Sequence, residues 1–187
     1  MFSLLRDLRS LRLEIDLEAP PGGRSLAIRH VDAGSCNGCE HELTLVTSPH
    51  YDLQRFGLNI VASPRHADVL LVTGAVTTRM RQALLTAYEA MPEPRRVVAL
   101  GNCALGCALL GVPEEMVGRV EDVLPVDLRI PGCPPHPRVI AEGLLRLLDG
   151  TTAWASSAQG AGSDRRCSAN GGDSSEPGAQ AEGVSDG

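Results

Sequence analysis

The sequence predicts an α/β fold in which a parallel β-sheet carries helices on both of its faces. Short apolar runs alternate with longer helical stretches along the middle of the chain, which is the pattern of repeated β-α-β units. One of these runs, 68–73, is almost wholly apolar, as expected for a strand that is covered on both faces. The predicted strands are 26–31, 58–62, 68–73, 96–100 and 126–130.

Two helices are predicted from the positions of proline and glycine. The stretch 80–91 is followed by Pro92 and Pro94, which cannot continue a helix. The stretch 137–148 begins with a proline, which suits the first turn of a helix, and Gly150 follows its end. Because parallel sheets of this kind bind their ligands beyond the carboxyl ends of the strands, we expect the chemistry at that edge.

The chain of 187 residues divides into three predicted parts. Residues 25–150 form the α/β domain. In residues 1–24, apolar side chains recur every three or four positions, which predicts an amphipathic helix followed by a linker. This helix either packs on its own domain or docks on a partner or an anionic membrane surface. Residues 151–187 are rich in Gly, Ser, Ala and acidic residues, so we expect a disordered acidic tail with too little apolar surface to offset its ordering entropy.

The composition argues against several classes of function. With a net charge of −6 and only 3% aromatic residues, the chain offers little to the phosphates or the bases of a nucleic acid. All 17 basic residues are arginine, so the P-loop and Schiff-base chemistry of lysine is excluded. No apolar run reaches the roughly 18 residues of a membrane-spanning helix, and the start of the chain lacks a signal-peptide core. We expect a cytoplasmic location, peripheral on the cytoplasmic face of the inner membrane if partners hold the chain there.

Four of the six cysteines follow predicted strands. Cys36 and Cys39 come after the first strand, Cys103 after the fourth and Cys133 after the fifth. Because the carboxyl ends of parallel strands meet at one edge of a sheet, we expect the four thiols to converge there. In a cytosolic chain of this size, such cysteines indicate metal ligands or redox centres before they indicate disulfides.

Glycine accompanies every one of these thiols, either next to it or one residue away. Glycine lets the backbone approach closely and aim N–H groups at the sulfurs, which favours an iron–sulfur cluster. The pattern alone leaves open a structural zinc site, a dithiol redox pair at Cys36 and Cys39, and cysteines with no shared role. The glycines are Gly34, Gly38, Gly101 and Gly132.

The two remaining cysteines are not assigned to the site. Cys107 lies four residues after Cys103, so a helix there would place both on one face. We interpret Cys107 as a small buried residue that faces the core. Cys167 falls in the acidic tail, where a flexible chain would hold a ligand poorly, and we interpret it as an incidental exposed thiol.

Four segments of the sequence resemble one known family. The family comprises the 20-kDa (B-type) subunit of respiratory complex I, the NADH:quinone oxidoreductase, together with the small subunits of membrane-bound, energy-converting [NiFe] hydrogenases. The most specific of the four matches is the Pro-Gly-Cys-Pro-Pro loop, and the resemblance runs from about residue 25 to 149. The matching segments are 34–42, 68–77, 91–104 and 125–135.

The resemblance implies a flavodoxin-like α/β domain with one [4Fe-4S] cluster at the C-terminal strand edge, bound by Cys36, Cys39, Cys103 and Cys133. Such a chain is an electron-transfer subunit of an oxidoreductase complex and holds no complete active site of its own. It would relay electrons between another cluster-bearing subunit and a large partner subunit of the [NiFe]-hydrogenase or complex I 49-kDa type. That partner would hold a nickel–iron centre in a hydrogenase or a quinone pocket in complex I, and the membrane arm would be reached through partners.

Two details of the sequence refine this resemblance. The spaced pair Cys36-Asn-Gly-Cys39 is similar to the energy-converting hydrogenases, whereas complex I subunits of this type resemble one another in carrying two adjacent cysteines. The resemblance also places an acidic residue near Glu42, which could couple electron arrival to proton uptake because a change in cluster charge shifts a nearby pKa. The alternative, which we favour, is that Glu42 is a helix N-terminal acid that interacts with the helix dipole.

Overall fold

A computed structural model describes residues 25–107 and 115–148 of the chain. Within these residues, a five-stranded parallel sheet has the order β2-β1-β3-β5-β7, which is the flavodoxin-like doubly wound order. The predicted fold class is therefore confirmed. The predicted N-terminal helix and the predicted acidic tail lie outside the described residues. The strands of the sheet are β1 (Leu26–Asp32), β2 (Leu58–Ile60), β3 (Val69–Thr73), β5 (Arg96–Leu100) and β7 (Leu128–Ile130).

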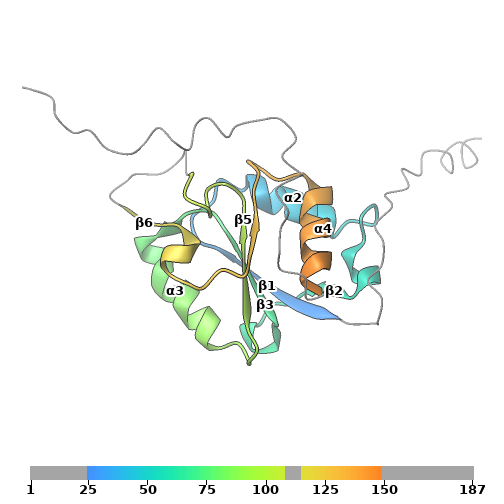
Figure 1. Ribbon diagram of the computed structural model, residues 1–187, viewed down its shortest axis with the longest axis horizontal. Coiled ribbons are helices and arrows are strands. Elements are labelled where there is room, and N and C mark those ends of the chain that lie inside the picture. The colour runs from blue at the N-terminus through green and yellow to red at the C-terminus, as the bar shows by residue number, and fades with distance from the viewer. Residues whose placement is uncertain (1–24, 108–114, 149–187) are drawn as a thin grey trace, which may run out of the picture.

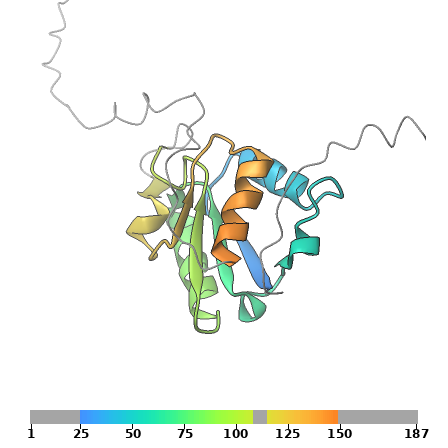
Figure 2. The same cartoon turned by 45° about the vertical axis from the view of Figure 1, so that its right-hand side comes forward.

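Helices cover both faces of the sheet, as the sequence predicts. Figures 1 and 2 show α2 (Gly38–Val46) and α4 (Pro137–Leu148) on one side of the strands and α3 (Thr78–Glu89) on the other. The side of α3 also carries a two-stranded antiparallel sheet that is not among the predicted elements. The smaller elements are β4 (Val76–Thr77), β6 (Met116–Gly118) and the 3-10 turns η1 (Leu53–Phe56), η2 (Pro64–His66) and η4 (Val120–Asp122). No helix in the described ranges is long and apolar enough to cross a bilayer.

The central strand β3 separates two hydrophobic cores. Its five residues are all buried, and successive side chains point to opposite faces. Leu71 joins the core under α2 and α4, while Leu70 and Val72 join the core under α3. Helix α4 supplies its apolar face to the first of these cores and packs on both β7 and α2. Because β3 packs against a core on each face, its sequence is a continuous apolar run and does not alternate between apolar and polar residues.

Two aspartates fix the register at the amino end of the sheet. The backbone N–H of Asp68 donates to the carbonyl of Ala27 at 2.8 Å, and its carboxylate accepts the N–H of Ala27 at 2.9 Å. Asp127 does the same with Val97, with distances of 2.9 and 2.7 Å. Each aspartate thereby makes two hydrogen bonds to the strand beside it, one residue before the first regular pair of the two strands.

The switch point of the sheet lies between β1 and β3. The chain leaves β1 through α2 on one face and leaves β3 through α3 on the other, so the loops after these strands part at the carboxyl edge. The two loops are in close contact there, because a Cβ placed on Gly74 would lie 2.4 Å from the backbone nitrogen of Ser35. Gly74 also has a φ of +76°, which favours glycine. The edge that carries the predicted site is thus the edge at which ligands of this fold class bind.

Candidate metal centre

The structure places all four predicted ligands beyond the carboxyl ends of strands, three of them in loops or turns and Cys39 at the start of a helix. Cys36 is exposed in the loop after β1, and Cys39 is half-buried in the first turn of α2. Cys103 is half-buried in the turn after β5, and Cys133 is exposed after β7. Three separate segments of the chain therefore bring cysteines to one edge of the sheet.

The loops that carry the thiols contact one another directly. A Cβ built on Gly101, which precedes Cys103 by two residues, would stand 2.6 Å from the sulfur of Cys39. A Cβ built on Gly38 would stand 3.5 Å from the sulfur of Cys36 and 3.8 Å from the Cβ of Pro134. The loop after β1 thus touches both of the other cysteine loops.

The electrostatic environment of Cys39 shows the same proximity. Burial of the thiol is the largest cause that raises its pKa, to about 12, and the negative charge of Glu40 comes next. The other three cysteines, Cys103, Cys36 and Cys133, raise the pKa further, so their sulfurs lie close enough to act on this one. A thiol must lose its proton to bind a metal. A positively charged group bound at this edge would offset the repulsion among four thiolates and favour their deprotonated form.

Among the described residues, the sulfurs are not arranged as the ligands of a single metal ion. Across residues 25–107 and 115–148, no three His, Cys, Asp or Glu side chains are grouped so that they could hold one metal ion. The donor chemistry itself fits a four-cysteine site, because the four thiols lie at one edge of the sheet and glycine backbone lies against two of the sulfurs. Four thiolates are the donor set of a [4Fe-4S] cluster and also of a structural zinc site.

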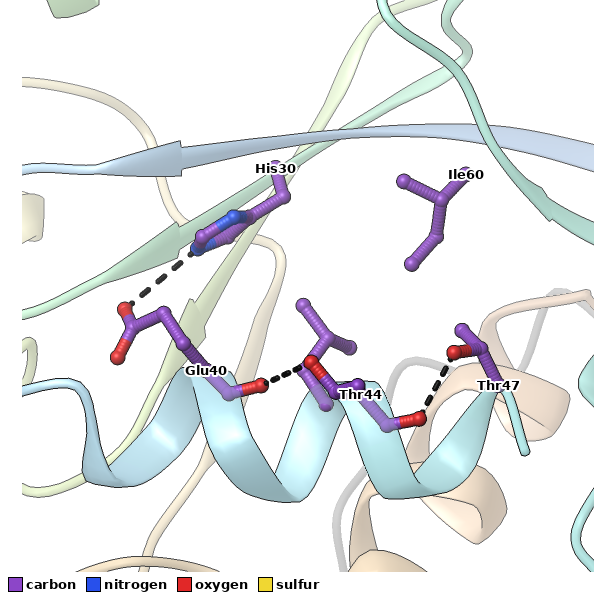
Figure 3. Close-up of a pocket in the computed structure, with 6 residues that line it drawn as sticks. His30, Glu40, Thr44, Thr47 and Ile60 are labelled. Atoms are coloured by element: carbon purple, nitrogen blue, oxygen red, sulfur yellow. Dashed lines mark hydrogen bonds and ion pairs between the residues drawn. The ribbon is translucent and has the colours of Figure 1, made fainter.

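A polar cluster anchors the first turn of α2 to the sheet, and Figure 3 shows two of its members, His30 and Glu40, facing each other. The hydroxyl of Thr73, at the end of β3, donates to the carboxylate of Glu40, the residue after Cys39. His30 of β1 lies with its Nε2 2.9 Å from the same hydroxyl and 3.7 Å from Glu40 Oε1. The second oxygen of Glu40 is buried and has no hydrogen-bond partner among the described residues. Sequence reasoning missed this anchor, because it joins residues 33 and 43 positions apart.

Burial of His30 in this cluster disfavours its charged form. Burial lowers its pKa from the ordinary value of 6.5, and this effect outweighs the neighbouring charges of Glu40 and Asp32, which act in the opposite direction. His30 and Glu40 also line a small cavity of about 180 Å³ next to α2, together with Leu43, Thr44, Thr47 and Ile60. The cluster therefore fixes α2, and with it Cys39, by polar contacts to two strands.

Glu42 and Cys107 differ from their favoured interpretations. Glu42 is the fifth residue of α2, and the acid in the first turn is Glu40, so the helix-dipole interpretation applies to Glu40 instead. Residues 102–106 form turns rather than a helix, since Gly106 has a φ of +102°. Cys107 is accordingly half-buried and not a core residue. Cys167 lies outside the described residues.

Comparison with known proteins identifies the family. The family model described as "NADH ubiquinone oxidoreductase, 20 Kd subunit" matches residues 36–147, which is more than half of the chain. The chain belongs to this family. The resemblance found in the sequence is thereby confirmed, and with it the class of oxidoreductase complex subunits.

Relatives in this family carry names from both of its branches. A probable membrane-bound hydrogenase subunit, mbhJ, of Pyrococcus furiosus is 42% identical over 127 residues, which cover 68% of this chain and 76% of that protein. Formate hydrogenlyase subunit 7 of Escherichia coli is 42% identical over 125 residues, covering 67% and 49%. The B-type subunit of the NADH-quinone oxidoreductase of Geobacter metallireducens is also 42% identical, over 111 residues that cover 59% and 65%. Sequence identity alone does not distinguish the branches.

Solved structures share the fold. A chain of the membrane-bound sulfane sulfur reductase, an archaeal respiratory membrane complex, superposes with a TM-score of 0.60 at 31% identity and covers 69% of this chain and 71% of that one. A chain of an NAD⁺-reducing [NiFe]-hydrogenase superposes with a TM-score of 0.57 at 21% identity, covering 72% and 97%. The second likeness concerns the fold only, and it agrees with the flavodoxin-like strand order.

Proposed function

We propose that this chain is an electron-transfer subunit of a membrane-associated, energy-converting [NiFe]-hydrogenase-like complex and that it carries one [4Fe-4S] cluster. The ligands would be Cys36, Cys39, Cys103 and Cys133. The observation that carries the proposal is the arrival of four thiols, on three segments of the chain, at the carboxyl edge of one parallel sheet. Membership of a family whose relatives are named as hydrogenase and NADH-quinone oxidoreductase subunits supports the same class of function.

The residues of this chain would hold and shield the cluster, which supplies one-electron chemistry when bound. Gly101 leaves room for the sulfur of Cys39, and the contact of Glu40 with Thr73 holds the turn in which Cys39 lies. Cys36 and Cys133 are exposed on the outside of the site. Solvent exposure tunes the reduction potential of such a centre. A large partner subunit that covers this edge would shield the two exposed thiols from solvent.

The choice between the two branches depends on that partner. The spacing Cys36-Asn-Gly-Cys39 favours the hydrogenase type, for which the partner would be a [NiFe]-hydrogenase large subunit and another subunit would carry further clusters. The alternative is a B-type subunit of a complex I-like enzyme with a 49-kDa-type partner. The complex would lie on the cytoplasmic face of the membrane. Nickel analysis of the purified native complex distinguishes the two branches, because only the hydrogenase type would contain nickel.

Glu42 is the proposed proton-coupled residue. It lies three positions after Cys39 on α2 and is half-buried. A Glu42→Gln variant of the cluster-loaded chain should show a midpoint potential that depends less steeply on pH than that of the wild type. An unchanged slope would remove Glu42 from the proposal.

The cluster itself is tested on the full-length chain purified without oxygen. We expect about four iron and four sulfide per chain and a spectrum typical of a reduced cluster in electron paramagnetic resonance after reduction. Zinc in place of iron, or the lack of any reduced signal, would overturn the proposal in favour of a structural zinc module.

A further inference from the structure

Asn102 connects two of the cysteine loops through a pair of hydrogen bonds. Its backbone N–H donates to the carbonyl of Gly132 at 2.8 Å, and its side-chain Oδ1 accepts the N–H of Gly132 at 2.8 Å. The two residues are 30 positions apart in the sequence and are joined by both of these bonds.

This connection continues the sheet beyond its last regular pair. Strands β5 and β7 are in register up to Leu100 and Ile130, and the N–H of Gly101 still donates to the carbonyl of Ile130 at 2.8 Å. At the next step the side chain of Asn102 takes the place of a strand carbonyl and accepts the N–H of Gly132. The side chain thus holds the two loops together where the strands no longer do.

The position of the connection gives it a consequence for the site. Asn102 immediately precedes Cys103, and Gly132 immediately precedes Cys133. The carbonyl of Asn102 also accepts the N–H groups of Leu105 and Cys107, at 3.1 and 2.8 Å, which closes the turn around Cys103. One residue therefore determines both the shape of the Cys103 turn and its distance from the Cys133 loop.

From this geometry we infer that Asn102 is a positioning residue that sets the relative placement of Cys103 and Cys133 for their common cofactor. The inference rests on the proposed function, since it concerns the spacing of two of the four proposed ligands. Asn102 acts through the backbone of the residue before each thiol rather than as a ligand itself. Loss of residues that orient metal ligands typically weakens metal binding by roughly 10- to 100-fold.

Two substitutions of the full-length chain separate the side-chain bond from mere bulk. In Asn102→Leu, no side-chain acceptor faces the N–H of Gly132, whereas Asn102→Asp keeps an oxygen at the same place. We expect the Leu variant to release iron to a chelator on the order of 10- to 100-fold faster than the wild type. We also expect altered g-values in the electron paramagnetic resonance spectrum of the reduced cluster. The Asp variant should restore the iron content and the line shape toward those of the wild type.

A matched control lies at the opposite edge of the sheet. Asp127 makes the same kind of two-bond connection, to Val97, far from the cysteine loops at the amino end of the strands. Asp127→Ala should lower the stability of the fold while leaving the g-values of the reduced cluster unchanged. Comparison of the two variants distinguishes a loss of stability from a displacement of ligands.

The outcomes for the cluster and for Asn102 can be told apart. If the wild type itself takes up no iron–sulfur cluster, the proposed function fails. If the wild type is loaded and Asn102→Leu shows wild-type iron release and an unchanged spectrum, the positioning role is wrong while the proposed function stands. If Asn102→Leu does not fold, Asn102→Asp alone decides the test. A wild-type spectrum in the Asp variant would support the role of the side-chain oxygen, and an altered spectrum would contradict it.

Discussion

Gly101 and Cys39 lie so close together that one more carbon atom between them would collide with the sulfur. A Cβ on Gly101 would stand 2.6 Å from Cys39 Sγ, and the φ of Gly101 is +90°. The contact joins the turn after β5 to the first turn of α2, two segments that lie far apart in the sequence. Glycine is needed there both for the space and for the backbone conformation.

The first prediction concerns this contact. Gly101→Ala should displace the sulfur of Cys39 and lower the iron content of the full-length chain loaded without oxygen. It should also destabilise the fold by about 1–2 kcal/mol, since alanine disfavours a positive φ. Gly38→Ala is the matched control, because its Cβ would lie 3.5 Å from Cys36 Sγ, which is ordinary van der Waals contact. Equal iron content in the two variants would show that the space beside Cys39 is not part of the site.

The second prediction concerns the assignment of the ligands. Cys133→Ser should destabilise the cluster, because serine offers a poorer donor to iron, and iron and sulfide per chain should fall well below those of the wild type. Cys167→Ser should keep the wild-type content, since Cys167 is not a proposed ligand. Elemental analysis and the absorbance of the brown chromophore measure both variants. Equal losses in the two variants would contradict the set of four ligands.

Local patterns in the sequence were sufficient to predict the five strands of the parallel sheet and the edge at which the thiols lie. The run 69–72 is apolar because β3 is buried on both faces, and after Thr73 the chain turns at Gly74. Helix α4 has its observed bounds because Pro137 starts it and its apolar residues recur on one face. Signals of this kind depend on neighbouring residues only, so they can be recognised in the chain itself.

Contacts between distant residues could not be predicted in this way. The bond between Thr73 and Glu40 and the pair formed by Asn102 and Gly132 depend on the register of strands that are far apart in sequence. Residues 102–106 form turns rather than the helix that would have placed Cys103 and Cys107 on one face, and the glycine at 106 was the available signal for those turns. The edge at which the four thiols lie could therefore be predicted from the sequence, but the groups that hold these loops together could not.

The third prediction concerns the stability of the sheet. Asp127→Ala removes the carboxylate that accepts the N–H of Val97 at 2.7 Å, so this part-buried donor loses its partner. We expect the free energy of unfolding to fall by about 1–2 kcal/mol, measured by urea denaturation. Glu142→Ala is the control: it breaks only the exposed pair with Arg138 on α4 and should cost about 0.3–0.5 kcal/mol. A loss of the same size in both variants would mean that the aspartate does not secure the strand.

The last prediction concerns pH and follows from the burial of His30. Because burial lowers the pKa of this histidine below its ordinary value of 6.5, the unfolded chain binds a proton at a higher pH than the folded chain does. The unfolded state therefore holds more protons as the pH falls below about 6.5, and the free energy of unfolding decreases from there down to the lower pKa of the folded state. Above that range both states are neutral at this position and the histidine contributes no pH dependence.

A variant that cannot titrate isolates this effect. The groups that act on His30 are Glu40 and Asp32, which favour its charged form, and Arg29, which opposes it, and all three remain in His30→Gln. Urea denaturation of the full-length chain should show a smaller loss of stability between about pH 7.5 and pH 5 in this variant than in the wild type. His66→Gln removes a histidine that is exposed on η2 and should keep the wild-type profile. If both variants followed the wild-type curve, the histidine between β1 and α2 would not be held neutral by the fold, and the polar anchor of Cys39 would tolerate its charge.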